Sequence, residues 1–325
     1  MIQLGQHPAP RHTVAHLSDP HLLAGDLLQY GVVRPEDGLR LVLGRLLRID
    51  PPPSALVFTG DLADRAEPAA YRRLRELVEP VADRLGAEVV WVMGNHDERD
   101  DYARELFGAE ATSPQDRVHV VDGLRIVSLD TSVPGWHHGA LDDDQLAWLA
   151  DVLATPAPDG TLLAMHHPPI PTPMLRAAEL IELLDQERLA DVVRGTDVRA
   201  VLAGHLHLST HSMFAGVPVS VASASCYTTD PAPLDRFVSG VDGGQAFSVV
   251  HVYDDRVVHT TVPLAAAAEV TGYPGDVAPL VEGLTFEERL DVFSRKDSEF
   301  NSGHEAHAPL PDEPVDEPLD VRSEP

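Results

Sequence analysis

The sequence predicts an α/β fold in which two β-sheets pack face to face as a sandwich, with helices on the outside. Strand-like apolar runs alternate with segments of helical periodicity up to about residue 208, which is the pattern of repeated βα units. Beyond residue 208, strand-like segments follow one another without intervening helices, which predicts antiparallel strands. The 325 residues are 43% hydrophobic, which is enough to bury one large core or two smaller ones.

The first part of the chain is predicted to form three βα units. Each begins with a short apolar run that ends in a polar motif, and a helical pattern follows it. Pro68 lies in the first turn of the second predicted helix, where its missing N–H costs nothing. The predicted strands are residues 13–19, 54–61 and 88–97, and the predicted helices are residues 35–49, 67–85 and a short helix beginning at residue 103.

The second part begins with a predicted hairpin. Residues 117–121 and 124–131 have strand character and are joined by Asp122-Gly123, a strong hairpin signal. Residues 142–154 have helical periodicity with acids in the first turn, where the helix dipole favours them. The remaining predicted strands are residues 161–167, 199–205, 209–214, 217–223, 245–253 and 256–264.

The two ends differ from this body, which is predicted to be one domain over residues 13–275. Residues 1–12 are polar and are expected to be a flexible arm; no apolar stretch precedes Val14, so no signal peptide is predicted. The C-terminal extension, residues 276–325, contains a helical pattern at 284–300. From Asn301 it holds seven acids, five prolines and one arginine, which predicts a disordered acidic end after about residue 300.

Charge and cysteine usage narrow the class of protein. Twenty-four Lys and Arg against 52 Asp and Glu give a formal net charge of −28, which argues against nucleic-acid binding and is otherwise a solubility feature. Cys226 is the only cysteine, so no intramolecular disulfide forms, as in a reducing compartment. No run of 18 apolar residues predicts a transmembrane segment. We expect a cytoplasmic protein, with peripheral association with the cell envelope as the alternative.

Five small polar motifs each lie at or just after the carboxyl end of a predicted buried strand. Because strand ends converge on one rim in α/β sheets, residues distant in the sequence meet there. Each motif alone is compatible with a turn or a packed histidine, but five together at strand ends favour a ligand site over core packing. Carboxylate, imidazole and amide ligands without a thiolate suit Mn, Fe or Zn ions. The motifs are Asp19-Pro20-His21, Gly60-Asp61, Gly94-Asn95-His96-Asp97, His166-His167-Pro168 and Gly204-His205-Leu206-His207.

In this order the motifs resemble the signature of the calcineurin-like metallophosphoesterase superfamily: D-x-H, G-D, G-N-H-D/E, H and G-H-x-H. The resemblance spans about Val14 to Pro263. It is more specific to the class III cyclic nucleotide phosphodiesterases, and in particular to their mycobacterial member. The stretches that carry it include HLSDPHL, VFTGDLAD, WVMGNHD, LDTSVPG, HHPPIP, RGTDVRAVLAGHLH and GVPVSVASASCYT. The resemblance implies a two-sheet sandwich flanked by helices, a homodimer, and residues 13–275 as a metallophosphoesterase catalytic domain.

The resemblance also implies two metal ions, with iron, manganese or both expected and zinc as the alternative. A carboxylate that bridges two cations roughly 3.5–4 Å apart is a common arrangement for displacement at phosphorus. The resemblance assigns one metal to Asp19, His21, Asp61 and His207, and the other to Asp61, Asn95, His166 and His205, so that Asp61 bridges them.

Several roles around the ligands follow as hypotheses. His96 is the candidate general acid for the leaving oxygen, or alternatively only a hydrogen-bond donor to phosphate. Asp64 and Asp97 are expected to orient ligands. His167 competes with His166 as the ligand, and the spacing to Pro168 in the family favours His166.

Catalysis is assigned to Asp61, Asn95 and His96, and substrate binding to Asn95, His96 and His138. His137 and His138 lie in a glycine-flanked loop that either touches the substrate or is simply exposed. Cys226 is expected to be a small buried apolar residue.

The resulting hypothesis is hydrolysis of cyclic nucleotide phosphodiesters, with 3′,5′-cyclic AMP as the first substrate. The first alternative is a broader phosphodiesterase acting on 2′,3′-cyclic nucleotides or other small phosphodiesters. The second is a partner- or envelope-binding module acting through the C-terminal extension.

Overall fold

The computed structural model describes residues 3–264, 272–273, 275 and 277–302, and these fall into two compact units. The main unit covers the described residues 11–264. The second unit, here called the helical unit, contains residues 3–10 together with the described residues from 272 to 302.

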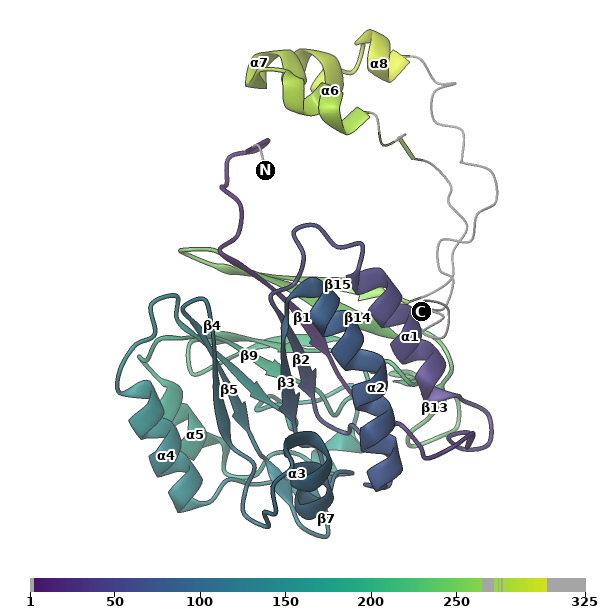
Figure 1. Cartoon of the computed structure of the whole chain (residues 1–325), viewed down its shortest axis with the longest axis vertical. Helices are drawn as coiled ribbons and strands as arrows, with labels where there is room; N and C mark the ends of the chain where they lie inside the picture. Colours follow the sequence, from purple (N-terminus) through teal and green to yellow (C-terminus); the bar gives the residue numbers. More distant parts are fainter. Residues whose placement is uncertain (1–2, 265–271, 274, 276, 303–325) are drawn as a thin grey trace. The chain divides into compact units, whose positions relative to one another are not determined.

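Two mixed sheets form the main unit (Figure 1). In the first sheet, β1, β2 and β3 run parallel to one another. Strand β14 pairs antiparallel with β1, and β15 pairs antiparallel with β14. In the second sheet, four central strands are parallel and each edge strand is antiparallel to its neighbour. The first sheet has the order β15 (Val257–Pro263), β14 (Ala246–Val252), β1 (His12–Leu17), β2 (Ala55–Thr59) and β3 (Glu88–Val92). The second has the order β10 (Thr210–Phe214), β11 (Val217–Val221), β9 (Val198–Ala203), β8 (Thr161–Met165), β5 (Leu124–Leu129) and β4 (Arg117–Val121).

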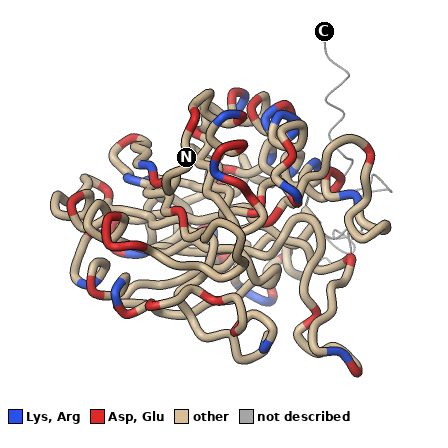
Figure 2. Tube along the Cα trace, turned by 90° about the horizontal axis from the view of Figure 1, so that it is seen from below, with Lys and Arg blue, Asp and Glu red and all other residues tan. Residues whose placement is uncertain are grey.

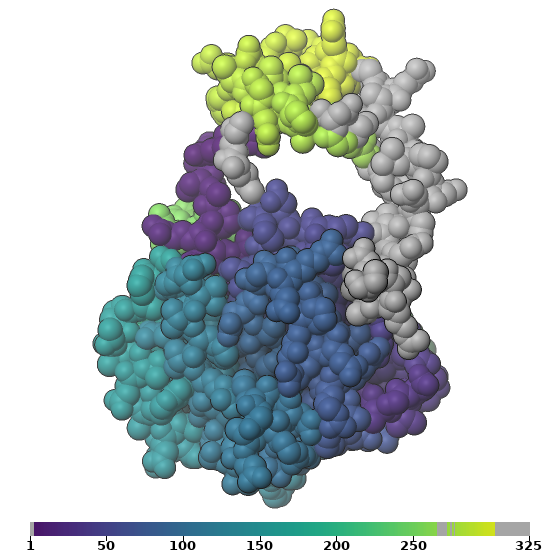
Figure 3. All heavy atoms as spheres, in the orientation of Figure 1, coloured from purple at the N-terminus to yellow at the C-terminus, as the bar shows by residue number. Residues whose placement is uncertain are grey.

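Helices cover the outer face of each sheet, so the layers run helix, sheet, sheet, helix. Helices α1 (Pro35–Leu46), α2 (Pro68–Leu85) and α3 (Arg99–Phe107) pack on the first sheet, and α4 (Asp143–Leu153) and α5 (Gln186–Val193) pack on the second. Figure 3 shows α1 and α2, in purple and blue, as a continuous layer of atoms over this face of the main unit. The predicted fold class, a two-sheet α/β sandwich flanked by helices, is confirmed.

Strong local signals define the ends of the long helices. Proline at the first turn starts both α1 and α2, and Gly86 ends α2 in the left-handed conformation with its N–H bonded to the carbonyl oxygens of Ala82 and Asp83. A capping box starts α4, where the Asp142 side chain accepts from the Gln145 N–H and Gln145 binds back to Asp142.

Strand residues alternate between two apolar layers, because successive side chains point to opposite faces. Val57 lies in the layer between the two sheets, whereas Leu56 and Phe58 face α1 and α2. Both faces of the central strands are therefore buried, which explains their nearly continuous apolar sequences.

Between the helices, Arg73 of α2 forms an ion pair with Glu36 of α1, at 2.8 Å between Nη2 and Oε1. Acidic and basic residues are interspersed in this way along the described trace (Figure 2).

Short elements were not predicted from the sequence. Helix α5 covers only eight residues, although Leu189, Ala190 and Val193 are buried at helical spacing. The loop with Trp136 and the two histidines is a small hairpin. In the loop before β14, two further strands of two residues each pair antiparallel. These elements are β6 (Ser132–Val133), β7 (Trp136–Gly139), the 3₁₀ turn Ala178–Leu180, β12 (Thr228–Thr229) and β13 (Gly240–Val241).

In the helical unit, the single helix predicted over residues 284–300 is interrupted. Helix α6 (Val277–Gly283) precedes it, α7 (Phe286–Arg289) continues as a π-helical turn (Leu290–Ser294), and α8 (Glu299–Ser302) follows a break. The ring of Phe300 packs on Phe293 and Tyr273, with centroids 4.6 and 5.1 Å away. The predicted disorder after about residue 300 falls almost entirely outside the described residues, which end at 302. Among the described helices, none has the length and apolar character needed to cross a bilayer.

Candidate metal centre

All seven predicted ligands lie just beyond the carboxyl ends of parallel strands. Those after β1, β2 and β3 come from the first sheet, and those after β8 and β9 come from the second. Five of the seven have left-handed backbone conformations, which non-glycine residues rarely adopt. Such strain is concentrated where a site requires it. The five φ values are 50° for Asp19, 44° for His21, 50° for Asp61, 71° for His205 and 52° for His207.

Glycines beside the ligands allow close approach within the first sheet, at Gly94, and between the two sheets, at Gly60. A Cβ on Gly94 would lie 2.2 Å from the Asp61 backbone nitrogen and 2.2 Å from its Oδ1, and one on Gly60 would lie 2.3 Å from His166 Nδ1. Only glycine fits at either position, which explains the G-N-H-D and G-D motifs in physical terms.

The first ligand cluster contains Asp19, His21, Asp61 and His207, each with one ligand atom within 4.8 Å of the others. His21 Nε2 lies 3.1 Å from His207 Nε2 and 3.3 Å from Asp61 Oδ2. His207 Nε2 lies 3.4 Å from Asp19 Oδ1. All four side chains are buried, with at most 6% of each residue exposed.

The second cluster shares Asp61 with the first. His166 Nε2 lies 3.4 Å from Asp61 Oδ2, 3.1 Å from Asn95 Oδ1 and 3.2 Å from His205 Nδ1. Asp61 Oδ2 is therefore close to one histidine of each cluster, His21 and His166. Its position is that of a carboxylate able to bridge two cations.

Each ligand imidazole is oriented through its other ring nitrogen. His21 Nδ1 donates to Asp64 Oδ1 (3.0 Å), and the other three donate to backbone carbonyl oxygens. These contacts fix the tautomer, so the nitrogen that faces the centre carries a lone pair. The carbonyl acceptors are Thr59 for His166 Nδ1 (2.8 Å), Tyr227 for His207 Nδ1 (3.0 Å) and Ile181 for His205 Nε2 (3.0 Å).

The donor set fits divalent cations. Lone pairs of four imidazoles, two carboxylates and an amide oxygen converge, and Asp19 Oδ1 is a buried atom without a hydrogen-bond partner among the described residues. A buried carboxylate oxygen left unpartnered is costly, and two cations between these atoms remove the cost. Neither of these two clusters includes a thiolate, as the sequence predicted for Mn, Fe or Zn, although Cys226 also lies close to His21 and His207.

The same convergence shifts the pKa values of the ligand side chains. Burial lowers the pKa of His207, but the Asp19 carboxylate outweighs it and raises that pKa to about 10. Burial likewise opposes protonation of His166, and the charge of Asp61 raises its pKa to about 9. Burial raises the pKa of Asp61, yet the His166 charge holds it well below the usual value. Protons and cations therefore compete for the same atoms.

His96 lies at the edge of this centre. Its backbone N–H donates to Asp61 Oδ1 (2.8 Å) and its Nδ1 donates to the Asp64 carbonyl oxygen (2.9 Å). Its ring packs edge-on against His21, with centroids 4.7 Å apart, and its side chain is 31% exposed. That exposure leaves the imidazole accessible from the solvent side of the cluster.

Asp97 orients the backbone around the ligands. Its carboxylate accepts from the N–H groups of Leu62, Ala63 and Gly94 at 3.1, 3.1 and 2.9 Å, and from the Tyr71 hydroxyl at 2.8 Å. It thereby ties the loop after β2 to the loop after β3. Burial, followed by the charge of Asp61, raises its pKa to about 6.

Of the neighbouring histidines, His167 has a ring nitrogen within 4.8 Å of ligand atoms of His166 and His205, but both of its ring nitrogens make other hydrogen bonds. Its Nδ1 bonds the Thr131 hydroxyl (2.8 Å) and its Nε2 donates to the His137 carbonyl oxygen (3.0 Å). Burial lowers its pKa to about 3. Both ring nitrogens are thus committed, which agrees with the preference for His166 as the ligand.

The β6–β7 hairpin brings His137 against the second cluster. The Asn95 amide donates to His137 Nδ1 (2.9 Å), and the His137 and His96 rings are 5.5 Å apart. His138 packs on Trp136, with ring centroids 5.6 Å apart. The substrate-binding role of His138 stays a prediction. His137, which the sequence analysis named as its loop partner without assigning it a role, is the histidine of this pair that contacts Asn95.

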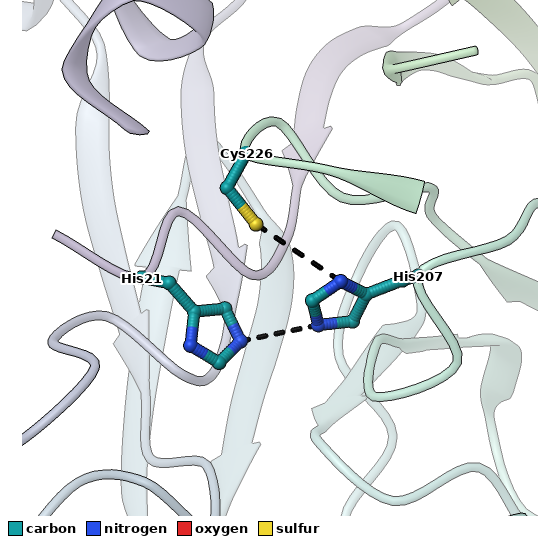
Figure 4. A group of neighbouring side chains, drawn as sticks. All are labelled: His21, His207 and Cys226. Atoms are coloured by element: carbon teal, nitrogen blue, oxygen red, sulfur yellow. Dashed lines mark hydrogen bonds between the residues drawn. The ribbon is translucent and has the colours of Figure 1, made fainter. Parts of the chain in front are cut away.

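Cys226 is buried, as predicted, with 3% exposed. Figure 4 shows it beside the His21–His207 pair, with its Sγ 4.0 Å from His207 Nδ1. That nitrogen faces away from the ligand cluster and donates to the Tyr227 carbonyl oxygen. The thiol therefore packs behind a ligand ring instead of joining the donor set.

Two comparisons with known proteins agree with this architecture. Residues 12–209 match the family model described as Calcineurin-like phosphoesterase. A cAMP/cGMP dual specificity phosphodiesterase from Mycobacterium tuberculosis is 54% identical over 270 residues, 83% of this chain and 85% of that protein. The protein named "Probable cyclic nucleotide phosphodiesterase" from Rhodococcus erythropolis is 51% identical over 277 residues, 85% of this chain and 91% of its own.

A solved structure shares the fold. A purple acid phosphatase from yellow lupin seeds superposes with a TM-score of 0.56 at 13% identity, over 78% of this chain and 51% of that one. Fold, site and sequence define a metal-dependent phosphoesterase. The chain belongs to the calcineurin-like phosphoesterase family, as its motifs predicted, and that family uses a dimetal centre.

Proposed function

We propose that this chain hydrolyses cyclic nucleotide phosphodiesters, with 3′,5′-cyclic AMP converted to AMP as the principal reaction. The observation that carries the proposal is the shared Asp61 Oδ2, which lies 3.3 Å from His21 Nε2 and 3.4 Å from His166 Nε2. The names of the two relatives at 54% and 51% identity support the choice of substrate.

The chain's own residues have separable roles in this proposal. Two bound cations would supply positive charge to the phosphate and lower the pKa of a water toward neutrality. Asp19, His21, Asp61 and His207 would hold one cation, and Asp61, Asn95, His166 and His205 would hold the other. The Asn95 amide also offers an N–H near the second cluster, where it orients a phosphate oxygen.

His96 is the proton donor to the departing sugar oxygen. Its Nδ1 is held by the Asp64 carbonyl oxygen, so its Nε2 is the nitrogen left to exchange a proton with a substrate. An alkoxide is a poor leaving group, and protonation as the bond breaks lowers the barrier.

For the metals, iron, manganese or both are proposed, with zinc as the alternative, because the donors are imidazole, carboxylate and amide groups. The cytoplasmic location and the homodimer inferred from the family resemblance stay predictions.

The alternative is a broader phosphodiesterase that acts on 2′,3′-cyclic nucleotides or other small diesters. Purified protein of measured metal content separates the two when it is assayed against 3′,5′-cyclic AMP, 2′,3′-cyclic AMP, bis(4-nitrophenyl) phosphate and a phosphomonoester. The proposal expects kcat/KM for 3′,5′-cyclic AMP to exceed that for the other natural diester. Turnover of the phosphomonoester alone would refute it.

A further inference from the structure

A pocket of about 360 Å³ lies beside the first ligand cluster, because Tyr227 of its lining packs against the ring of His207. Its size lies within the range of small-molecule sites, roughly 300–1,000 Å³. Two loops form its walls, one after His21 and one between β11 and β14. The lining includes Tyr30, Val32, Tyr227, Ser239, Val241 and Asp242.

Both walls are anchored to metal-ligand residues. On one side, the buried Gln29 donates from Nε2 to Asp64 Oδ1 (2.9 Å), the same oxygen that accepts from His21. On the other, the Thr229 N–H donates to the His207 carbonyl oxygen (3.3 Å), and the Tyr227 carbonyl oxygen accepts from His207 Nδ1. The pocket is therefore held in a fixed relation to the first cluster.

Aromatic surface lines the pocket at its boundary with the metal centre. The Tyr227 ring packs 4.5 Å from the His207 ring and 5.5 Å from the Tyr30 ring, and the two tyrosine hydroxyls are 3.3 Å apart. Tyr30 is nevertheless 75% exposed and Val32 is 74% exposed. Large apolar side chains exposed together next to a catalytic centre indicate a binding surface.

We propose that this pocket binds the purine base of the cyclic nucleotide whose phosphate lies at the metal centre, an inference that rests on the proposed function. A purine presents a large flat face, and stacking on aromatic side chains is favourable for any base. Asp242 also lines the pocket, and its carboxylate, one oxygen of which accepts from the Gln245 amide (2.8 Å), can accept a hydrogen bond from the exocyclic amino group of adenine.

The test compares substrates with and without a base on the full-length protein. Tyr30→Ala removes a wall of the pocket, and Val241→Phe fills part of its volume. Loss of base stacking predicts that each variant lowers kcat/KM for 3′,5′-cyclic AMP at least about fivefold more than for bis(4-nitrophenyl) phosphate. The loss is expected mainly in KM. Val120→Ala, at the 70% exposed Val120 of β4, is the control and should leave both values unchanged.

AMP binding, measured by calorimetry, supplies a readout that does not need turnover. Both pocket variants should weaken AMP binding at least about fivefold. If wild-type protein hydrolyses bis(4-nitrophenyl) phosphate but no cyclic nucleotide, the proposed function fails, and AMP binding still decides the role of the pocket. The pocket proposal is overturned if wild-type protein does not bind AMP, or if both variants keep the wild-type substrate ratio and AMP affinity within twofold.

Discussion

His166 and His167 are neighbours in the chain, and both are fully buried, so they form a matched pair for testing the ligand assignment. His166 Nε2 faces Asp61 and Asn95 at 3.4 and 3.1 Å, whereas both nitrogens of His167 bind Thr131 and the backbone of His137. Replacing His166 with Ala removes one of the four groups of the second cluster. Replacing His167 with Ala leaves that cluster intact but deletes buried packing and two hydrogen bonds.

The two substitutions are expected to change different properties, turnover and metal content for His166→Ala and stability for His167→Ala. Loss of residues that only orient ligands already costs roughly 10–100-fold in metal affinity or activity, so His166→Ala should lower turnover at least about a hundredfold and reduce the bound metal. His167→Ala should lower the free energy of unfolding by about 2–4 kcal/mol, through the cavity and the unpartnered hydrogen-bonding groups, with a smaller loss of turnover.

The assay measures metal per chain by mass spectrometry, turnover of 3′,5′-cyclic AMP, and urea unfolding for both variants. Asn95→Ala serves as a second ligand variant and should resemble His166→Ala with a milder loss of metal. The reasoning is refuted if His167→Ala loses metal and turnover while His166→Ala retains both.

Three further predictions concern catalysis, salt and acid. His96→Ala should impair diesters with alkoxide leaving groups far more than aryl diesters, which depart without protonation; an equal loss on both would leave His96 only a positioning role. Because the net charge is −28, moderate inert salt should leave kcat unchanged and not depress kcat/KM, whereas a steep fall would point to a polyanionic substrate. Burial lowers the pKa of His16 to about 3, so this residue stays neutral in the folded protein. The unfolded chain takes up a proton at this histidine below about pH 6.5, so the free energy of unfolding decreases as the pH is lowered. From pH 7 to pH 5 this proton uptake lowers the free energy of unfolding by about 2 kcal/mol. Urea titrations at the two pH values should show a decrease that is smaller by this amount in His16→Gln than in the wild type. An identical pH dependence of the two proteins would contradict the burial argument.

The long-range arrangement of the centre could be predicted because strand topology determines it. Asp61 and Asn95 follow neighbouring parallel strands, and His166 and His205 follow two neighbouring strands of the other sheet. Alternate side chains of each strand point into the apolar layer between the two sheets, so the sheets pack face to face and these two sets of strand ends lie together. Sequence order and strand ends predicted that these motifs meet, whereas their division between two metals came from the family resemblance.

The orientation of individual rings could not be predicted. His205 faces His166 through Nδ1 because its Nε2 donates to the Ile181 carbonyl oxygen, which lies in an irregular segment. Similarly, His207 is oriented by the Tyr227 carbonyl oxygen across a separation of 20 residues. No local sequence pattern encodes such contacts, since they depend on where loops settle on the finished sheets.

The pocket beside the first cluster was also outside the reach of sequence patterns. Tyr30 and Tyr227 are 197 residues apart and meet only because each loop is tied to a ligand histidine or its partner. Their exposure is unremarkable when each residue is considered alone. Helix α5 was missed for a different reason, since eight residues give too few helical repeats for a distinct period.

The most direct test of the dimetal assignment is a metal titration of chelator-treated wild-type protein, with turnover of 3′,5′-cyclic AMP followed as ions are restored. The shared position of Asp61 Oδ2 between His21 and His166 predicts no turnover without metal and full turnover at two ions per chain. Full turnover of the metal-free protein, or saturation at one ion per chain, would contradict the account.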